Sequence, residues 1–138
     1  MKQINYITKD NFGKYGRIID FTGQEGNPPF EVIIQNEDDP WRIAMLRVEE
    51  REFTFLEKHP GSLETFEPVE GICLLLVSLE TQKSDYEVFV LDRAVCLDKD
   101  VWHGIVSLAD VSKVKITENL EVDTDYYHLA APMQIFVD

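Results

Sequence analysis

The segment "FLEKHPGSLETFEPVEGICLLLVS", Phe55 to Ser78, carries most of the features that decide the fold. It contains a histidine, a Pro-Gly pair, several carboxylates, a second turn signal and a compact apolar run. Pro-Gly and Glu-Gly pairs at such positions are typical of turns, and short apolar runs between turns are typical of buried strands. The segment therefore predicts short strands, and it leaves two readings open. It is either an acidic surface hairpin or a place where His59 and the glutamates point together into a pocket.

The same pattern extends outward along the chain. Turn residues at 23–29, 36–40, 59–62, 68–71 and 98–100 separate segments with period-two or compact apolar character. Many short strands at near-regular spacing indicate an all-β sandwich or barrel. The expected strands are 17–21, 30–35, 41–48, 52–58, 72–79, 86–92, 94–97, 101–108, 113–117 and 133–138.

One short helix is expected near the N-terminus. Thr8 is a suitable N-cap for the residues that follow, and Gly13 and Gly16 limit the helix to about two turns. The chain has 138 residues, which suits one well-cored domain, so residues 1–138 are expected to form a single domain.

The composition narrows the range of partners. The formal net charge is −13, from 26 acidic and 13 basic side chains, and this charge argues against nucleic acid and anionic membranes as partners. The longest apolar run, at 72–77, is much shorter than the roughly 20 residues of a membrane-spanning helix. With no signal-like start, a cytoplasmic protein is expected. Cys73 and Cys96 are expected to be buried free thiols.

Two of the three histidines are candidates for chemistry. Residues two apart on a strand share a face, so Glu57 and His59 should point the same way, and Glu64 can return beside them after the turn. His59 is either a solvated turn residue or a ligand. His103 is either a hydrogen-bonded core residue or a pocket ligand, and His128 is expected in a loop without a functional role.

Two histidines and two glutamates are enough to bind one divalent metal ion. His59, His103, Glu64 and Glu57 could supply the donor atoms, and two histidines with one carboxylate would leave open positions for substrate. Acidic residues are abundant in this chain, so some of them lie near histidines by chance.

The segment 57–71 resembles the first cupin motif, G-x5-H-x-H-x3,4-E-x6-G. His59 is followed by four residues and Glu64, and Glu64 by six residues and Gly71, while Glu57 occupies the place of the first histidine. The segment "DKDVWH", 98–103, resembles the second cupin motif and keeps its histidine as His103. This resemblance implies a double-stranded β-helix, that is, a cupin-like jelly-roll barrel, in agreement with the strand pattern.

Within the cupins, the chain resembles the ureidoglycolate lyase family. The resemblance rests on "NFGKYGRIID" at 11–20, "LEKHPGSLETFEP" at 56–68 and "DVWHGIVSL" at 100–108, and on Arg47 in "AMLRV". The chain departs from the family's pattern at Thr54, Phe55 and Gly104, where the family commonly has polar residues, and at Leu97 and Asp98, where it commonly has tyrosine and histidine. The segment "TENLEVDTDYY" at 117–127 replaces a glycine-rich segment often seen in the family.

The resemblance implies an enzyme of purine (allantoin) breakdown, a carbon–nitrogen lyase that releases glyoxylate and urea from ureidoglycolate. Arg47 would hold the substrate's carboxylate, and His59 or His103 would act as base near Glu57. Lys58, Glu64, Phe66 and Trp102 would line the pocket. The resemblance further implies a homodimer. Two alternatives stay open: a cupin enzyme for another small metabolite, and a cupin that only binds one.

Overall fold

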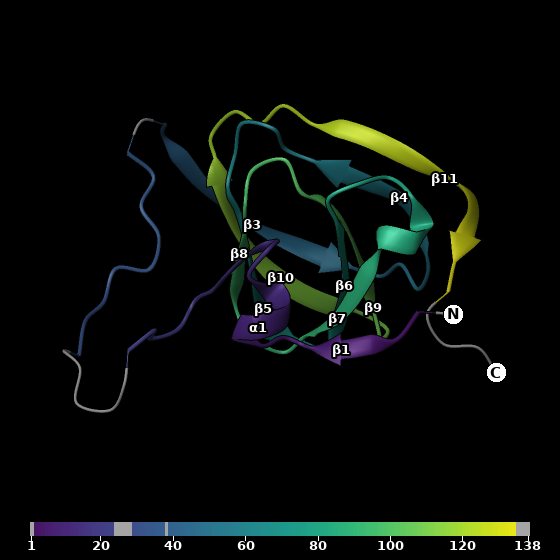
Figure 1. Ribbon diagram of the computed structural model, residues 1–138, viewed down its shortest axis with the longest axis horizontal. Coiled ribbons are helices and arrows are strands. Elements are labelled where there is room, and N and C mark those ends of the chain that lie inside the picture. The colour runs from purple at the N-terminus through teal and green to yellow at the C-terminus, as the bar shows by residue number, and fades with distance from the viewer. Residues whose placement is uncertain (1, 24–28, 38, 135–138) are drawn as a thin grey trace.

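The computed structural model describes residues 2–23, 29–37 and 39–134. Its strands form two sheets that face each other (Figure 1). The six-stranded sheet has the order β1-β7-β6-β9-β4-β11, and the five-stranded sheet has the order β2-β8-β5-β10-β3. The strands are β1 Ile4–Tyr6, β2 Gly16–Ile18, β3 Trp41–Val48, β4 Phe53–Lys58, β5 Glu64–Glu70, β6 Cys73–Ser78, β7 Glu87–Leu91, β8 Val95–Leu97, β9 Trp102–Ser107, β10 Ser112–Asn119 and β11 Asp125–Met133.

The architecture confirms the expected all-β fold, a cupin-like jelly-roll barrel. Apart from the parallel pair of β1 and β7, neighbouring strands are antiparallel. The main core fills the space between the sheets and includes Phe12, Tyr15, Phe66 and Phe89, each at most 2% exposed.

The apolar run of β6 is buried on both sides because two cores meet at this strand. Cys73, Leu75 and Val77 point into the main core, and the alternating Leu74 and Leu76 join a second cluster on the outer face of the six-stranded sheet. In Figure 1, β11 curves around the outside of the barrel beside β4. Its last residue, Met133, belongs to the second cluster and helps to cover that face.

The helix α1 spans Lys9–Phe12 and is one turn long, shorter than expected. Thr8 is its N-cap, as expected: the Thr8 hydroxyl accepts a hydrogen bond from the Asn11 amide, and the Asn11 side chain accepts one from the Thr8 amide. The helix ends at Gly13, and Phe12 anchors it in the core. A second helical turn, the 3-10 helix η1, spans Lys83–Asp85. In the described part of the chain, no helix has the length and apolar character that crossing a membrane requires.

Three strand predictions were wrong or incomplete. Residues 30–35 are irregular and, in the described part, pair with no strand (Figure 1). The strand β5 was interpreted in part as a turn because of Pro68, yet it lies between β8 and β10. The register of β10 shifts at Lys113/Val114, opposite this proline, and such an irregularity tolerates the missing amide.

The third difference lies at the C-terminal end. Residues 125–133 form β11 where the sequence predicted a loop around His128. Most side chains of this strand are exposed, so it lacks the apolar alternation of a half-buried strand. Pairing with β4 makes it a strand. The strand expected at 133–138 has only Met133 and Gln134 among the described residues, and 135–138 lie outside them.

Candidate metal centre and adjoining cavity

Three neighbouring elements bring the expected residues together. Glu57 of β4 lies directly opposite His103 of β9. His59 follows β4 immediately, and the turn at Pro60–Gly61 leads to Glu64, the first residue of β5. The expected common face for Glu57 and His59, and the return of Glu64 beside them, are both found.

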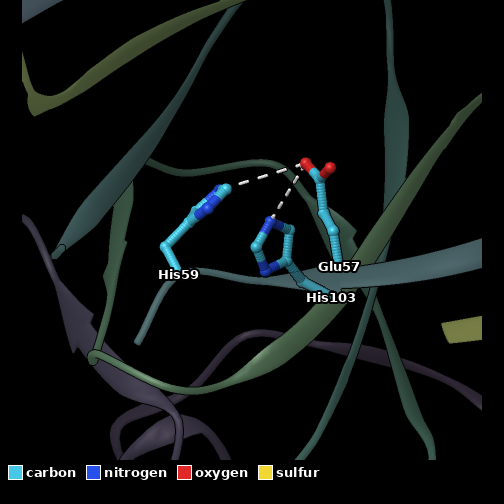
Figure 2. Close-up of side chains that lie close together, drawn as sticks. All are labelled: Glu57, His59 and His103. Atoms are coloured by element: carbon cyan, nitrogen blue, oxygen red, sulfur yellow. Dashed lines mark ion pairs between the residues drawn. The ribbon is translucent and has the colours of Figure 1, made fainter. Parts of the chain in front are cut away.

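The side chains converge at their tips. His59 Nε2 lies 3.2 Å from Glu64 Oε1 and 4.0 Å from Glu57 Oε1, and His103 Nε2 lies 3.0 Å and 3.6 Å from the same two oxygens. Figure 2 shows both imidazoles directed at the carboxylate of Glu57. His59, His103 and Glu64 are buried, whereas the side chain of Glu57 is 30% exposed. The two histidines are therefore inward-facing residues, and the reading of His59 as a solvated turn residue is wrong.

The far side of each imidazole is fixed by the backbone. His103 Nδ1 lies 3.0 Å from the carbonyl oxygen of Val101, and His59 Nδ1 lies 3.3 Å from that of Asp123. A carbonyl oxygen only accepts, so each Nδ1 carries a proton in these contacts and Nε2 faces the carboxylates. Nε2 presents a lone pair when the imidazole is neutral and an N–H when it is protonated. The Thr124 hydroxyl also contacts His59 Nδ1, at 3.1 Å. Ligating histidines are commonly held this way by a second hydrogen bond.

The donor set fits a divalent metal ion. Glu64 Oε1 and His103 Nε2 are buried, and although they are 3.0 Å apart, neither has a hydrogen-bond partner of suitable geometry among the described residues. Neighbouring donors around a tetrahedral or octahedral ion at 2.0–2.2 Å are separated by about 2.8–3.6 Å. The observed separations of 3.0–4.0 Å are close to that range. Glu57, His59 and His103 alone form a group that could hold such an ion.

In the absence of a metal ion, the protonated histidines and the ionised glutamates of the cluster stabilise each other's charges. Burial lowers the pKa of His103, but the carboxylates of Glu57 and Glu64 outweigh burial and raise the pKa to about 10. Burial also lowers the pKa of His59, and Glu64 reverses the direction, so the net shift is upward. For Glu64, burial raises the pKa while the two histidines lower it to about 2. Protons and a metal ion would therefore compete for the same imidazoles.

One residue of this cluster, Glu118 of β10, was not predicted from the sequence. Glu118 lies opposite Glu64 on β5 and opposite Arg42 on β3. Glu118, His59 and Glu64 form a second group that could hold a metal ion. Burial and the neighbouring Glu64 raise the pKa of Glu118. Only the pairing of β10 with β5 identifies this residue, because Glu118 belongs to no motif.

A cavity of about 230 Å³ adjoins the cluster. Glu57, Glu64 and His103 form its polar wall. The rest of the lining is mainly apolar or peripheral: Leu46, Arg47, Val48, Glu50, Glu52, Phe53, Thr54, Phe55, Phe66, Gly104, Ile105 and Ile116. Three of the positions that depart from the family's pattern, Thr54, Phe55 and Gly104, are therefore part of this cavity.

Two residues expected in the pocket lie elsewhere. Lys58 Nζ lies 2.9 Å from Asp100 Oδ1 and 4.8 Å from the centre of the Trp102 ring, outside the cavity lining. Strand alternation is the reason: Glu57 and His103 face inward, so Lys58 and Trp102 face outward. Phe66 does line the cavity, and its ring contacts His103 edge-on at 5.5 Å between centroids.

Arg47 borders the cavity but does not contact the cluster. It is exposed and alternates along β3 with Leu46 and Val48, which pack into the core, so its side chain starts on the outer face. No ion pair joins Arg47 to Glu57 or Glu64 within the described ranges. His128 is exposed on β11, on a strand where a loop was expected.

Three hollows larger than this cavity lie away from the histidines. One, of about 470 Å³, lies between α1, β2 and residues 31–33, and another, of about 600 Å³, lies between residues 30–36 and the five-stranded sheet. A third, of about 450 Å³, lies beside Tyr15 and Glu87. None of the three is lined by a histidine. The cavity of about 230 Å³ is the candidate site because, of these four, it is the one lined by both Glu57 and Glu64.

Comparisons with known proteins support the fold. No protein-family model and no curated protein sequence matches the chain. Among solved structures it is similar to tomato (Solanum lycopersicum) vicilin, with a TM-score of 0.50 and 12% identity over 65% of this chain and 26% of vicilin. It is also similar to Bacillus subtilis oxalate decarboxylase, with a TM-score of 0.48 and 15% identity over 66% of this chain and 24% of the decarboxylase. A dTDP sugar isomerase from Desulfovibrio desulfuricans has a TM-score of 0.44 and 13% identity over 78% of this chain and 77% of the isomerase.

The likeness to vicilin supports the architecture described above, two facing sheets of mainly antiparallel strands. The chain has a cupin-like fold, and it spans about a quarter of the length of vicilin and of oxalate decarboxylase. At such low identity the likeness extends to the fold alone. The finer resemblance to ureidoglycolate lyases has no match behind it and stays a prediction.

Proposed function

We propose that the chain is an enzyme that holds one divalent metal ion on His59, Glu64 and His103 and acts on a small carboxylate-bearing molecule in the adjoining cavity. The observation that carries the proposal is the convergence of His59 Nε2 and His103 Nε2 on Glu64 Oε1, which has no hydrogen bond of suitable geometry among the described residues. Each Nδ1 is fixed by a backbone carbonyl. A metal ion also answers an electrostatic need, because an anionic substrate would otherwise meet Glu57 and Glu64.

The resemblance of the sequence makes ureidoglycolate the first substrate to test. Cleavage removes the proton of the carbinol hydroxyl, converts that carbon to the aldehyde of glyoxylate, and breaks the carbon–nitrogen bond as the nitrogen of urea gains a proton. A bound divalent ion would supply Lewis-acid stabilisation of the negative charge on the carbinol oxygen. Glu57, the most exposed member of the cluster, faces the cavity and is the base that takes the hydroxyl proton.

Arg47 is the substrate's carboxylate clamp in this proposal, since it is the one arginine or lysine that borders the cavity in the described part of the chain. Its side chain would have to turn over the rim, where its planar fork suits a carboxylate. Arg47→Ala should therefore raise the KM much more than it lowers kcat.

The direct experiment measures glyoxylate and urea release from ureidoglycolate by the purified protein, with Mn²⁺, Fe²⁺ or Zn²⁺ and after chelation. Metal-dependent release that is lost in Glu57→Gln is the expected result. Glu67→Gln is the matched control, because Glu67 is a carboxylate of the same barrel that does not line this cavity. Absence of release with every metal would refute the lyase activity.

The apolar lining favours a second candidate, a metal-holding cupin for a less polar metabolite. Phe53, Phe55, Ile105 and Ile116 lie where a highly polar substrate would leave groups unpaired. A ligand that binds only the folded state raises the melting temperature, so a thermal-shift screen of small apolar acids in the presence of metal would identify such a ligand. A hit that is not turned over would define a binding protein.

A further inference from the structure

Glu118 approaches the metal cluster from the strand that lies beside Glu64. On β10, Val114 and Ile116 belong to the core between the sheets, and alternation places Glu118 on the same inner face. The side chain of Glu118 is 9% exposed, and its donor atom lies within 4.8 Å of those of His59 and Glu64.

Arg42 fixes the orientation of this carboxylate. Its Nε and one terminal nitrogen both donate to Glu118 Oε2, at 3.0 Å and 2.7 Å. Both hydrogen bonds end on one oxygen, so Arg42 leaves Oε1 available to another partner. Arg42 thus acts as a positioning residue for Glu118 in the way that outer residues orient metal ligands.

A second observation points to a cation between these groups. The buried Glu64 Oε1 has no hydrogen-bond partner of suitable geometry in the described part of the chain, and the side chains of Glu64 and Glu118, 7% and 9% exposed, lie on paired strands. Adjacent carboxylates repel each other unless one of them is protonated or a cation lies between them. Among the described residues, Arg42 forms an ion pair with Glu118 and none with Glu64.

We infer that Glu118 is a further protein donor to the proposed metal ion, oriented by Arg42, and that it makes the site prefer a six-coordinate ion such as Mn²⁺ to a four-coordinate one. This inference rests on the metal site of the proposed function. Two imidazoles and one carboxylate leave a tetrahedral ion one position short of completion, and adding oxygen donors favours ions that take more and harder ligands. Glu57, Glu64 and Glu118 carry three negative charges, which a divalent ion and Arg42 neutralise together.

The test is calorimetric titration of Mn²⁺ and of Zn²⁺ into chelator-treated wild type, Glu118→Gln and Glu67→Gln. The two glutamates are matched: each belongs to the five-stranded sheet and pairs with a basic residue on a neighbouring strand, Glu118 with Arg42 and Glu67 with Lys115. Only Glu118 faces the cluster. The two substitutions change the net charge equally, so the comparison separates coordination from long-range electrostatics.

We expect Glu118→Gln to weaken Mn²⁺ binding about tenfold or more, with a smaller loss for Zn²⁺, while Glu67→Gln binds like wild type. Equal Mn²⁺ affinity in wild type and Glu118→Gln would overturn the inference and leave the proposed metal site intact. Absence of binding in wild type would overturn both. If Glu118→Gln does not fold, Glu118→Asp withdraws the oxygens by one methylene and should still bind Mn²⁺ more weakly than wild type; wild-type affinity in that variant would equally overturn the inference.

Discussion

His103 Nε2 lies 3.0 Å from Glu64 Oε1 inside the barrel, and neither atom has a hydrogen-bond partner of suitable geometry among the described residues. Unpaired buried polar atoms are rare in folded proteins because each costs about 1–3 kcal/mol. Their closeness to His59 Nε2 and Glu57 Oε1 gives the pair an explanation: a cation between them would satisfy all four atoms at once.

Replacing His103 should abolish tight metal binding. His103→Ala removes one nitrogen donor, so the affinity for a divalent ion is expected to fall by about 100-fold or more, as measured by calorimetric titration. His128→Ala removes an exposed histidine of β11 and should leave the affinity unchanged. Equal losses in the two variants would show that the observed binding is unrelated to the cluster.

The stability of the metal-free protein should depend on pH through the same residues. The folded-state pKa of His103 is raised from 6.5 to about 10. The contribution of His103 to the free energy of unfolding is therefore complete below pH 6.5 and is lost as the pH rises through 10. The folded-state pKa of Glu64 is lowered from 4.5 to about 2. The contribution of Glu64 to the free energy of unfolding is therefore complete above pH 4.5 and is lost as the pH falls through 2. Urea unfolding of chelated protein should therefore show highest stability between about pH 4.5 and 6.5.

A matched variant assigns the alkaline part of this profile. His103→Gln should remove much of the decline in unfolding free energy between pH 6.5 and 10, because His59 is then the one imidazole of the cluster that still titrates beside Glu64. An unchanged profile in this variant would assign the decline to other groups.

Strand periodicity correctly predicted that Glu57, His59 and Glu64 lie close together. It placed Glu57 and His59 on one face, and the short turn after His59 returned Glu64 to the same place. The same rule excludes Lys58 and Trp102 from that face, so their assignment to the pocket came from the motif and not from the geometry. A motif shows which residues occur at fixed spacings in a family. The alternation of side chains along a strand determines which face of the sheet each of them lies on.

Other features depend on contacts between segments that are distant in the sequence. Glu118 joins the site only because β10 pairs with β5, and β11 is a strand only because β4 provides its partner. Residues 30–35 have strand-like composition but pair with no strand in the described part of the chain. Local pattern cannot decide these cases because β-structure is stabilised by the neighbouring strand.

The two cysteines should be unreactive in the folded protein. Burial raises the pKa of Cys96 to about 12 and raises that of Cys73, so little thiolate is present at neutral pH. Reaction with a disulfide reagent is expected to be slow for native protein and to give two thiols per chain after denaturation. Rapid modification of the native protein would contradict the buried positions of both residues.

The homodimer expected from the sequence stays a prediction, and β3 offers the surface to test. This edge strand exposes Trp41, Ile43 and Met45 at 60%, 57% and 57%. An apolar row on an edge strand favours pairing with another copy. Analytical ultracentrifugation should give twice the mass of the 16.0-kDa chain for wild type, and Ile43→Lys should shift the protein toward monomer. A wild-type monomer at high concentration would exclude this interface.

A divalent metal ion held by His59, Glu64 and His103 can be tested by its stoichiometry. The metal content is measured for wild type and for His59→Ala/His103→Ala after dialysis against Mn²⁺, Fe²⁺ or Zn²⁺ and removal of loosely bound ions. We expect one ion per chain in wild type and none in the double variant. Wild type without a stoichiometric ion, or equal metal content in the two proteins, would refute the metal site.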